Sequence, residues 1–180
     1  MFKKKFFAML FIAISLAPNG ANASTHGKSL QNLGMNEIMF AQMMIPHHEQ
    51  AILMSEIALK KTKDADILKL SRQIKSLQSK EVSQLTYWLK ATDSSMTMDH
   101  DMKMSGMLSK KELNSLKTST GNNFNRLFLE LMIKHHKGAL EMLVLISDSE
   151  NSEAKALAKA IKLAQSKEIS IMKLQLNKLK

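Results

Sequence analysis

Residues 44–54 read MIPHHEQAILM, and residues 132–142 read MIKHHKGALEM. Each copy has a His-His pair with one methionine before it and an alanine and a second methionine after it. Four of the six histidines of the chain lie in these two copies. The match widens to seven of fifteen positions between residues 40–54 and 128–142, and to six of nine between residues 74–82 and 161–169. The chain is therefore an internal repeat, and its two halves need a common explanation.

Apolar residues around both motifs recur at helical spacing. The first long helix is expected over residues 34–63, with Pro46 inside it. Pro46 removes one backbone donor and should kink this helix without ending it, because the second copy has Lys134 there and the pattern continues. Further helices are expected from a cap at Asp64 or Asp66 to about residue 92, from the capping box at Ser109 to about residue 117, from about residue 123 to 147, and from a cap at Ser149 or Ser152 towards residue 180.

Each repeat is thus a helical hairpin with one apolar face on each helix. One hairpin cannot bury that face alone, so two hairpins are expected to pack together as an all-α four-helix bundle. Residues 34–92 form the first hairpin, residues 93–108 a Met/His-rich linker, and residues 109–180 a short helix and the second hairpin. We interpret residues 34–180 as one domain.

The beginning of the chain has the pattern of a signal peptide over residues 1–23. Three lysines precede an apolar run at residues 6–16, which is too short to span a membrane. Ala21-Asn22-Ala23 is a small-x-small cleavage site, so cleavage is expected after Ala23. The mature protein is expected to be periplasmic or secreted, with a flexible arm over residues 24–33 and no stable membrane insertion.

The amino-acid composition excludes several classes of site and partner. The chain has no cysteine, which excludes a disulfide scaffold and a thiolate metal site. The formal net charge is +10, but the lysines are scattered without interleaved aromatic residues, so no nucleic-acid partner is expected. Methionine is the outlier, with 15 residues.

The two motifs have the donor types of a soft-metal site. Spacings of three and four residues place thioether and imidazole groups on one helix face, and Ala51 leaves volume beside them. Thioether and imidazole together favour copper(I), with copper(II) and silver(I) also compatible. Adjacent histidines diverge by about 100° on a helix, so one of each pair is expected to face the interior. The predicted metal ligands of the motifs are Met44, His47, His48, Met54, Met132, His135, His136 and Met142. A packing role for the methionines is the alternative.

The linker is a second candidate region. Five methionines and one histidine lie within residues 96–107, in a segment too polar and aperiodic to belong to a core. Flexible thioethers could wrap a copper(I) or silver(I) ion, and they are otherwise a liability to oxidation outside the cytoplasm. The predicted ligands here are Met96, Met98, His100, Met102, Met104 and Met107.

Several other chemistries are disfavoured. No glutamate stands three residues before a motif histidine, as a di-iron bundle would need. Covalent haem attachment needs cysteine, and no metalloprotease motif, phosphate loop or nucleophile elbow occurs. We therefore do not expect an enzyme. Glu81 and Glu168 occupy matching repeat positions. They could be buried carboxylates that support the metal ligands, but the preferred expectation is a solvated face or a polar contact between helices, as it is for Gln78 and Gln165.

The two motifs, each beginning with a phenylalanine at residue 40 or 128, resemble the exported bacterial family called domain of unknown function 305. The resemblance covers residues 34–180 and implies a ferritin-like four-helix bundle. Some members are described as periplasmic copper- or silver-binding proteins. An aspartate often stands three residues before the motif phenylalanine, where this chain has Glu37 and Asn125. Lys134 and Lys137 put positive charge beside the second His-His pair, which predicts weaker metal binding there.

The leading interpretation is a periplasmic copper(I) or silver(I) binding protein for metal sequestration or tolerance. Its partners would be metal ions and a periplasmic metal-handling protein. The first alternative is a helical envelope-stress or interaction module with a methionine-rich binding surface. The second is a bundle that binds haem without covalent attachment.

Overall fold

The computed structural model describes residues 33–98 and 104–179. All regular structure in these residues is helical, which confirms the predicted all-α bundle. The elements are α2 (Met35–Lys61), α3 (Ala65–Ala91), α4 (Lys110–Thr118), α5 (Gly121–Met142), the 3-10 turn η1 (Leu143–Leu145) and α6 (Ser152–Lys178). The predicted signal peptide, residues 24–32 of the predicted arm, His100 and Met102 lie outside the described residues.

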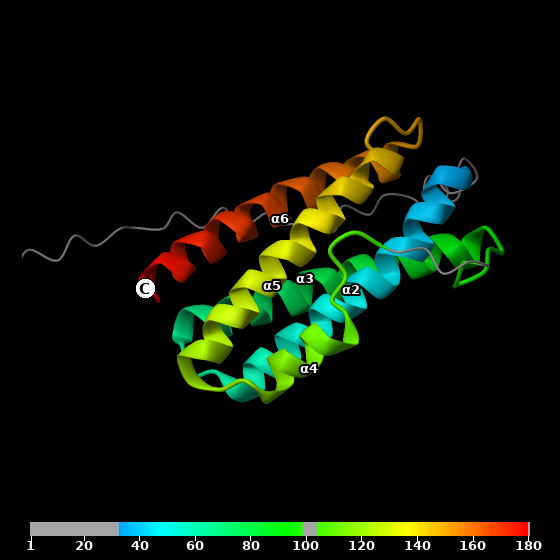
Figure 1. The fold of residues 1–180 in the computed structure, drawn as a ribbon. Helices are drawn as coiled ribbons and strands as arrows, with labels where there is room; N and C mark the ends of the chain where they lie inside the picture. Colours follow the sequence, from blue (N-terminus) through cyan, green and yellow to red (C-terminus); the bar gives the residue numbers. More distant parts are fainter. Residues whose placement is uncertain (1–32, 99–103, 180) are drawn as a thin grey trace, which may run out of the picture.

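The long helices form two antiparallel hairpins. α2 packs along α3, α5 packs along α6, and the hairpins meet through α2 and α5 (Figure 1). The short helix α4 lies beside this meeting point and contacts α5. Pro46 lies inside α2, which continues through it as one helix. None of the described helices is long and apolar enough to cross a membrane.

Helix ends follow local capping chemistry. The Asp64 side chain accepts a hydrogen bond from the backbone N–H of Ile67, and Ser109 forms a capping box with Glu112. The predicted cap of α6 at Ser149 or Ser152 is wrong. Asn151 caps this helix, because its side-chain oxygen accepts from the backbone N–H groups of Glu153 and Ala154 in the first turn.

The third long helix also differs from the prediction. α5 begins at Gly121, with Thr120 as the N-cap residue, rather than at about residue 123. Its α-helical part ends at Met142, five residues before the predicted end, and continues as the tighter turn η1. Such 3-10 turns are common at helix ends, and apolar periodicity does not distinguish them from one more α-helical turn.

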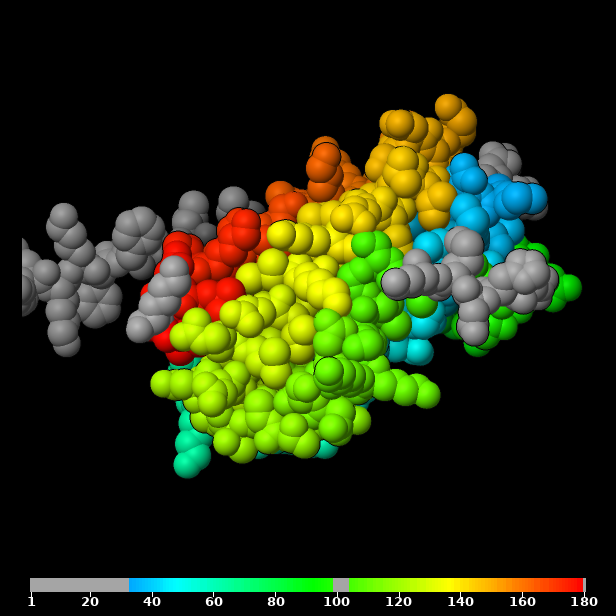
Figure 2. Space-filling view, in the orientation of Figure 1, coloured from blue at the N-terminus to red at the C-terminus, as the bar shows by residue number. Residues whose placement is uncertain are grey.

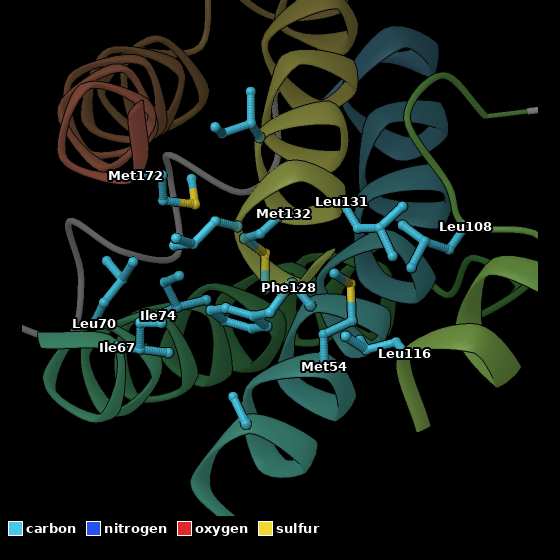
Figure 3. Packing of buried hydrophobic residues seen from close by; sticks show 14 of the residues in the cluster. Met54, Ile67, Leu70, Ile74, Leu108, Leu116, Phe128, Leu131, Met132 and Met172 are labelled. Atoms are coloured by element: carbon cyan, nitrogen blue, oxygen red, sulfur yellow. The ribbon is translucent and has the colours of Figure 1, made fainter. Parts of the chain in front are cut away.

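Two apolar clusters fill the bundle, and each takes one end of each motif. Phe40 and Met44, from the start of the first motif, share a cluster with Ala139 and Met142, from the end of the second. The reciprocal residues form the other cluster with aliphatic side chains from α3 and α6, as Figure 3 shows around Met54, Phe128 and Met132. α2 and α5 therefore run past each other in opposite directions. The His-His pairs, in the middle of each motif, lie between the two clusters.

Two matched hydrogen bonds join the hairpins. Thr62, after α2, donates to the side-chain oxygen of Asn125 on α5 at 2.7 Å. Ser149, before α6, donates to the carboxylate of Glu37 on α2. Glu37 and Asn125 occupy matching repeat positions, and each accepts a hydrogen bond from the loop of the opposite hairpin.

Candidate metal centre

The middle of the bundle brings together one histidine from each motif. The rings of His47 and His135 lie 3.8 Å apart between centroids, at an interplanar angle of 38°. Both side chains are buried, with relative exposures of 0% and 1%. We call them the inner pair. The two motifs therefore contribute to one shared place in the bundle.

Most of the ring nitrogens of the inner pair have no hydrogen-bond partner. The Nε2 atom of His47 lies 3.1 Å from the backbone carbonyl oxygen of Ser105. Its Nδ1 atom and both ring nitrogens of His135 have no hydrogen-bond partner. A buried polar atom without a partner costs about 1–3 kcal/mol, so such atoms call for an explanation. A bound metal ion that accepts a lone pair from each ring would explain why these nitrogens lack protein partners.

Burial also keeps these imidazoles unprotonated. Desolvation and the neighbouring His48 lower the pKa of His47 to about 3. Desolvation and the neighbouring His47 lower the pKa of His135 well below its ordinary value. Both rings are therefore neutral at physiological pH, which is the state that donates a lone pair to a metal ion.

The other two histidines, His48 and His136, form an outer pair with different surroundings. The Nε2 atom of His48 lies 2.8 Å from Oε2 of Glu81 on α3. The Nε2 atom of His136 lies 2.8 Å from Oε2 of Glu168 on α6. All four side chains are buried. For the glutamates, the expected solvated face is wrong and the contact between helices is confirmed. The less favoured alternative, a buried carboxylate beside a motif histidine, also agrees with the structure.

The sequence repeat carries a signal for these histidine–glutamate pairs. Each glutamate follows its histidine at nearly the same distance in the two repeats, and each belongs to the repeated Gln-Ser-Lys-Glu segment. Gln78 and Gln165 are buried as well, and neither amide has a hydrogen-bond partner. A band of polar side chains therefore crosses the bundle between the two apolar clusters.

The end of the linker covers the inner pair. Gly106, with φ of 78°, brings the chain onto α5, where a Cβ at Gly138 would come within 2.0 Å of the Ser105 carbonyl oxygen. Gln50 on α2 holds the same segment through both backbone groups of Leu108, at 2.6 and 3.1 Å. In Figure 2 the green segment leading to α4 lies between the yellow surface of α5 and the blue-to-cyan surface of α2. Gly138, inside the second motif, is the sequence feature that permits this close approach.

The predicted methionine ligands fall into two environments. Met44, Met54, Met132 and Met142 are buried within the apolar clusters on either side of the histidines. Of the linker methionines that the structure describes, Met96 is 42% exposed, and Met98, Met104 and Met107 are half-buried. The structure thus places the motif sulfurs in the core and the linker sulfurs at the surface.

Lys134 does not point its charge into the centre. Its ammonium group lies 2.6 Å from the carboxylate of Glu112 on α4, and 47% of the side chain is exposed. The expected weakening of a second site by this lysine therefore loses its basis. Within the described part of the chain, no three His, Asp or Glu side chains group together as a metal site. A metal ion at the inner pair would need few ligands, or would need thioether or carbonyl donors as well.

The family model described as domain of unknown function (DUF305) matches residues 37–176. No protein with a curated description matches.

Solved structures of similar proteins exist. A DUF305 protein of Streptomyces coelicolor is 26% identical, with a TM-score of 0.76, over 80% of this chain and 93% of that one. A DUF305 fragment of Deinococcus radiodurans is 28% identical, with a TM-score of 0.75, over 81% and 97%. CopM in its Cu(I)-bound form is 30% identical, with a TM-score of 0.66, over 79% and 96%. CopM structures with silver, with Cu(II) and without metal are also similar.

Proposed function

This chain belongs to the DUF305 family, and we propose that it binds copper(I) or silver(I) at the inner pair, His47 and His135. The observation that carries the proposal is the set of three buried imidazole nitrogens without partners, on rings 3.8 Å apart. Neutral imidazole is a common ligand of such ions, and both rings stay neutral at physiological pH. Similarity to CopM, whose structures hold Cu(I) and silver, supports the same class of ion.

The rest of the centre suits a soft monovalent ion. Copper(I) and silver(I) accept two or three ligands, whereas zinc in proteins is almost always held by four. Methionines fill the volume on both sides of the inner pair and keep water away from it. When bound, the ion would accept one lone pair from each neutral imidazole. The chain would supply the imidazoles, exclude water and hold the cover over them.

The biological role that we propose is sequestration or relay of the ion outside the cytoplasm, without catalysis. The linker methionines at the surface would capture the ion, and the inner pair would hold it. Of the two alternative functions, the haem bundle is disfavoured because rings 3.8 Å apart leave no space for a porphyrin between them. The interaction module has no specific contact in its favour.

Anaerobic titration of the mature chain with copper(I), against a chromogenic chelator, tests the proposal. The double variant His47→Leu/His135→Leu should lose the tightly bound ion. Lys134→Ala, which changes a charge next to His135 at the surface, is the matched control and should bind as the parent does. Tight binding that survives in the double variant would move the ion elsewhere, and the absence of competition in the parent would overturn metal binding altogether.

A further inference from the structure

Three methionines on α2 have no place in the centre described above. Met35, Met39 and Met43 recur every four residues and therefore lie along one face of the helix. This row borders the buried face, since His47 stands four residues after Met43. Met39 and Met43 are half-buried, and Met43 packs against the edge of the cluster that contains Phe40 and Met44.

The linker lies against the same helix, where two glutamines of α2 hold it. The side-chain amide of Gln42 donates to the carbonyl oxygens of Ser95 and Thr97, at 2.9 and 3.4 Å. Gln50, eight residues later on α2, holds Leu108 at the other end of the linker. The two ends of the linker are therefore fastened to α2.

The fastening places thioethers of the linker beside those of the helix. Met96 stands between the two residues that Gln42 binds, and Met98 follows them. On the helix, Met39 lies one turn before Gln42 and Met43 directly after it. Met43 and Met104 also pack against the same apolar cluster, so the later part of the linker returns to this region.

We propose that Met39, Met43, Met96 and Met98 form a second site, for one copper(I) or silver(I) ion held by thioethers. The class of ion rests on the proposed function, but the site shares no residue with the inner pair. Thioether sulfur is neutral and soft, so this site selects monovalent soft ions over zinc, calcium or magnesium. It lies at the surface, and Met96 is exposed to solvent, so an ion can enter without opening the bundle.

The site also explains an unusual arrangement of apolar side chains. A surface segment that held α2 only by packing would be served as well by leucine, which is less easily oxidised. Here sulfur is present on both sides of the contact between helix and linker. Gln42 supplies the register that brings the two sets together, and its bonds to backbone carbonyls leave the linker side chains free to turn towards the helix.

Silver(I) titration of the full mature chain, followed through the ¹³C-labelled methionine methyl groups, tests the site. The methyl signals of Met39, Met43, Met96 and Met98 should shift together with the first equivalents of silver. The methyl of Met172, buried in the other apolar cluster, is the internal control and should not move. In the Met39→Leu/Met43→Leu variant the bound silver should fall by one ion, and the linker methyl shifts should weaken.

The same titration in the His47→Leu/His135→Leu variant separates this site from the inner pair. Joint shifts of the four methyl groups that persist there support the second site, whatever the fate of the inner one. Shifts of linker methyls without those of Met39 and Met43 would overturn the second site and leave the proposed function intact. An absence of any methyl shift, with silver bound only when the histidines are present, would overturn it too. No silver binding in any variant would overturn both.

Discussion

The inner and outer histidines are neighbours in sequence but differ in what satisfies them. His48 and His136 each meet a buried glutamate from the partner helix of the same hairpin. His47 and His135 meet each other, and only one of their four ring nitrogens has a protein partner. Each outer histidine thus has a buried carboxylate beside Nε2, although its Nδ1 atom has no hydrogen-bond partner. The inner pair has buried ring nitrogens that are available to bind a ligand.

This difference teaches how one repeated dipeptide can serve two purposes. Successive residues on a helix diverge by about 100°, so the outer histidine reaches sideways to the neighbouring helix. The inner one reaches across to the other hairpin. The outer contacts stabilise the fold, whereas the inner pair lowers its stability in the absence of a ligand. Changes to each pair should therefore have opposite effects.

The largest effect is expected from removing a glutamate that contacts the outer pair. Glu81→Ala leaves the buried Nε2 of His48 without its acceptor, and Glu168→Ala does the same to His136. Loss of one partner of a buried ionisable pair costs about 3 kcal/mol. Chemical denaturation of the apo protein measures this loss. Glu56→Ala, which breaks an exposed contact with Lys75, is the control and should leave the free energy of unfolding unchanged. Equal effects at Glu56 and Glu81 would remove the distinction.

The inner pair should respond in the opposite direction. His47→Leu/His135→Leu replaces unpartnered buried nitrogens with apolar atoms, so the apo protein should gain about 2 kcal/mol. Metal-dependent stabilisation should disappear at the same time. Thermal unfolding with and without silver(I) measures both. A destabilised double variant would show that the inner nitrogens are satisfied in solution, for example by buried water.

The pH dependence of stability sharpens the comparison further. The inner histidines have an ordinary pKa of 6.5 when unfolded and lowered pKa values when folded, about 3 for His47. Between these values the unfolded chain binds more protons, so stability is complete above pH 6.5 and declines as the pH falls towards 3. Each inner histidine contributes a slope of at most about 1.4 kcal/mol per pH unit. Denaturation midpoints from pH 8 to pH 4.5 should fall less steeply in the His47→Leu/His135→Leu variant. Parallel curves would contradict the assignment.

The smallest effect is expected at the cover. Gln50→Ala removes two partly buried hydrogen bonds and should cost about 1 kcal/mol. The amide of Leu108 should nevertheless exchange its hydrogen faster, because the linker end is released from α2. Gln42→Ala, at the other end of the linker, serves as the control and should not alter exchange at Leu108. An unchanged rate in Gln50→Ala would mean that the packing of Gly106 on Gly138 alone holds the cover.

Much of the fold was predictable because it depends on local chemistry. Apolar spacing predicted the long helices, and side-chain oxygens at Asp64 and Ser109 predicted two helix starts. The repeat predicted that two hairpins pack together. Asn151 was missed because three neighbouring polar residues can all cap a helix, and only the path of the loop decides between them.

The site was predictable only in its residue types. The motif identified the histidines, but periodicity along one helix cannot say which histidine meets the other hairpin. The partners of the outer pair lie more than thirty residues away on other helices, so their burial depends on packing. The cover over the inner pair depends on a close backbone approach at Gly138, which a single glycine in a helix only hints at.

The matched hydrogen bonds between hairpins relate the two halves as a two-fold axis relates the subunits of a homodimer. Residue i of one half meets residue j of the other, and j meets i, as Thr62 with Asn125 and Ser149 with Glu37 show. A lone hairpin could have assembled this bundle by self-association, with one gene position supplying both inner imidazoles. Fusion into a single chain lets equivalent positions diverge. Gln50 and Gly138 are such equivalents, and one grips the linker while the other makes room for it. The asymmetric cover is thus something that two identical subunits could not have built.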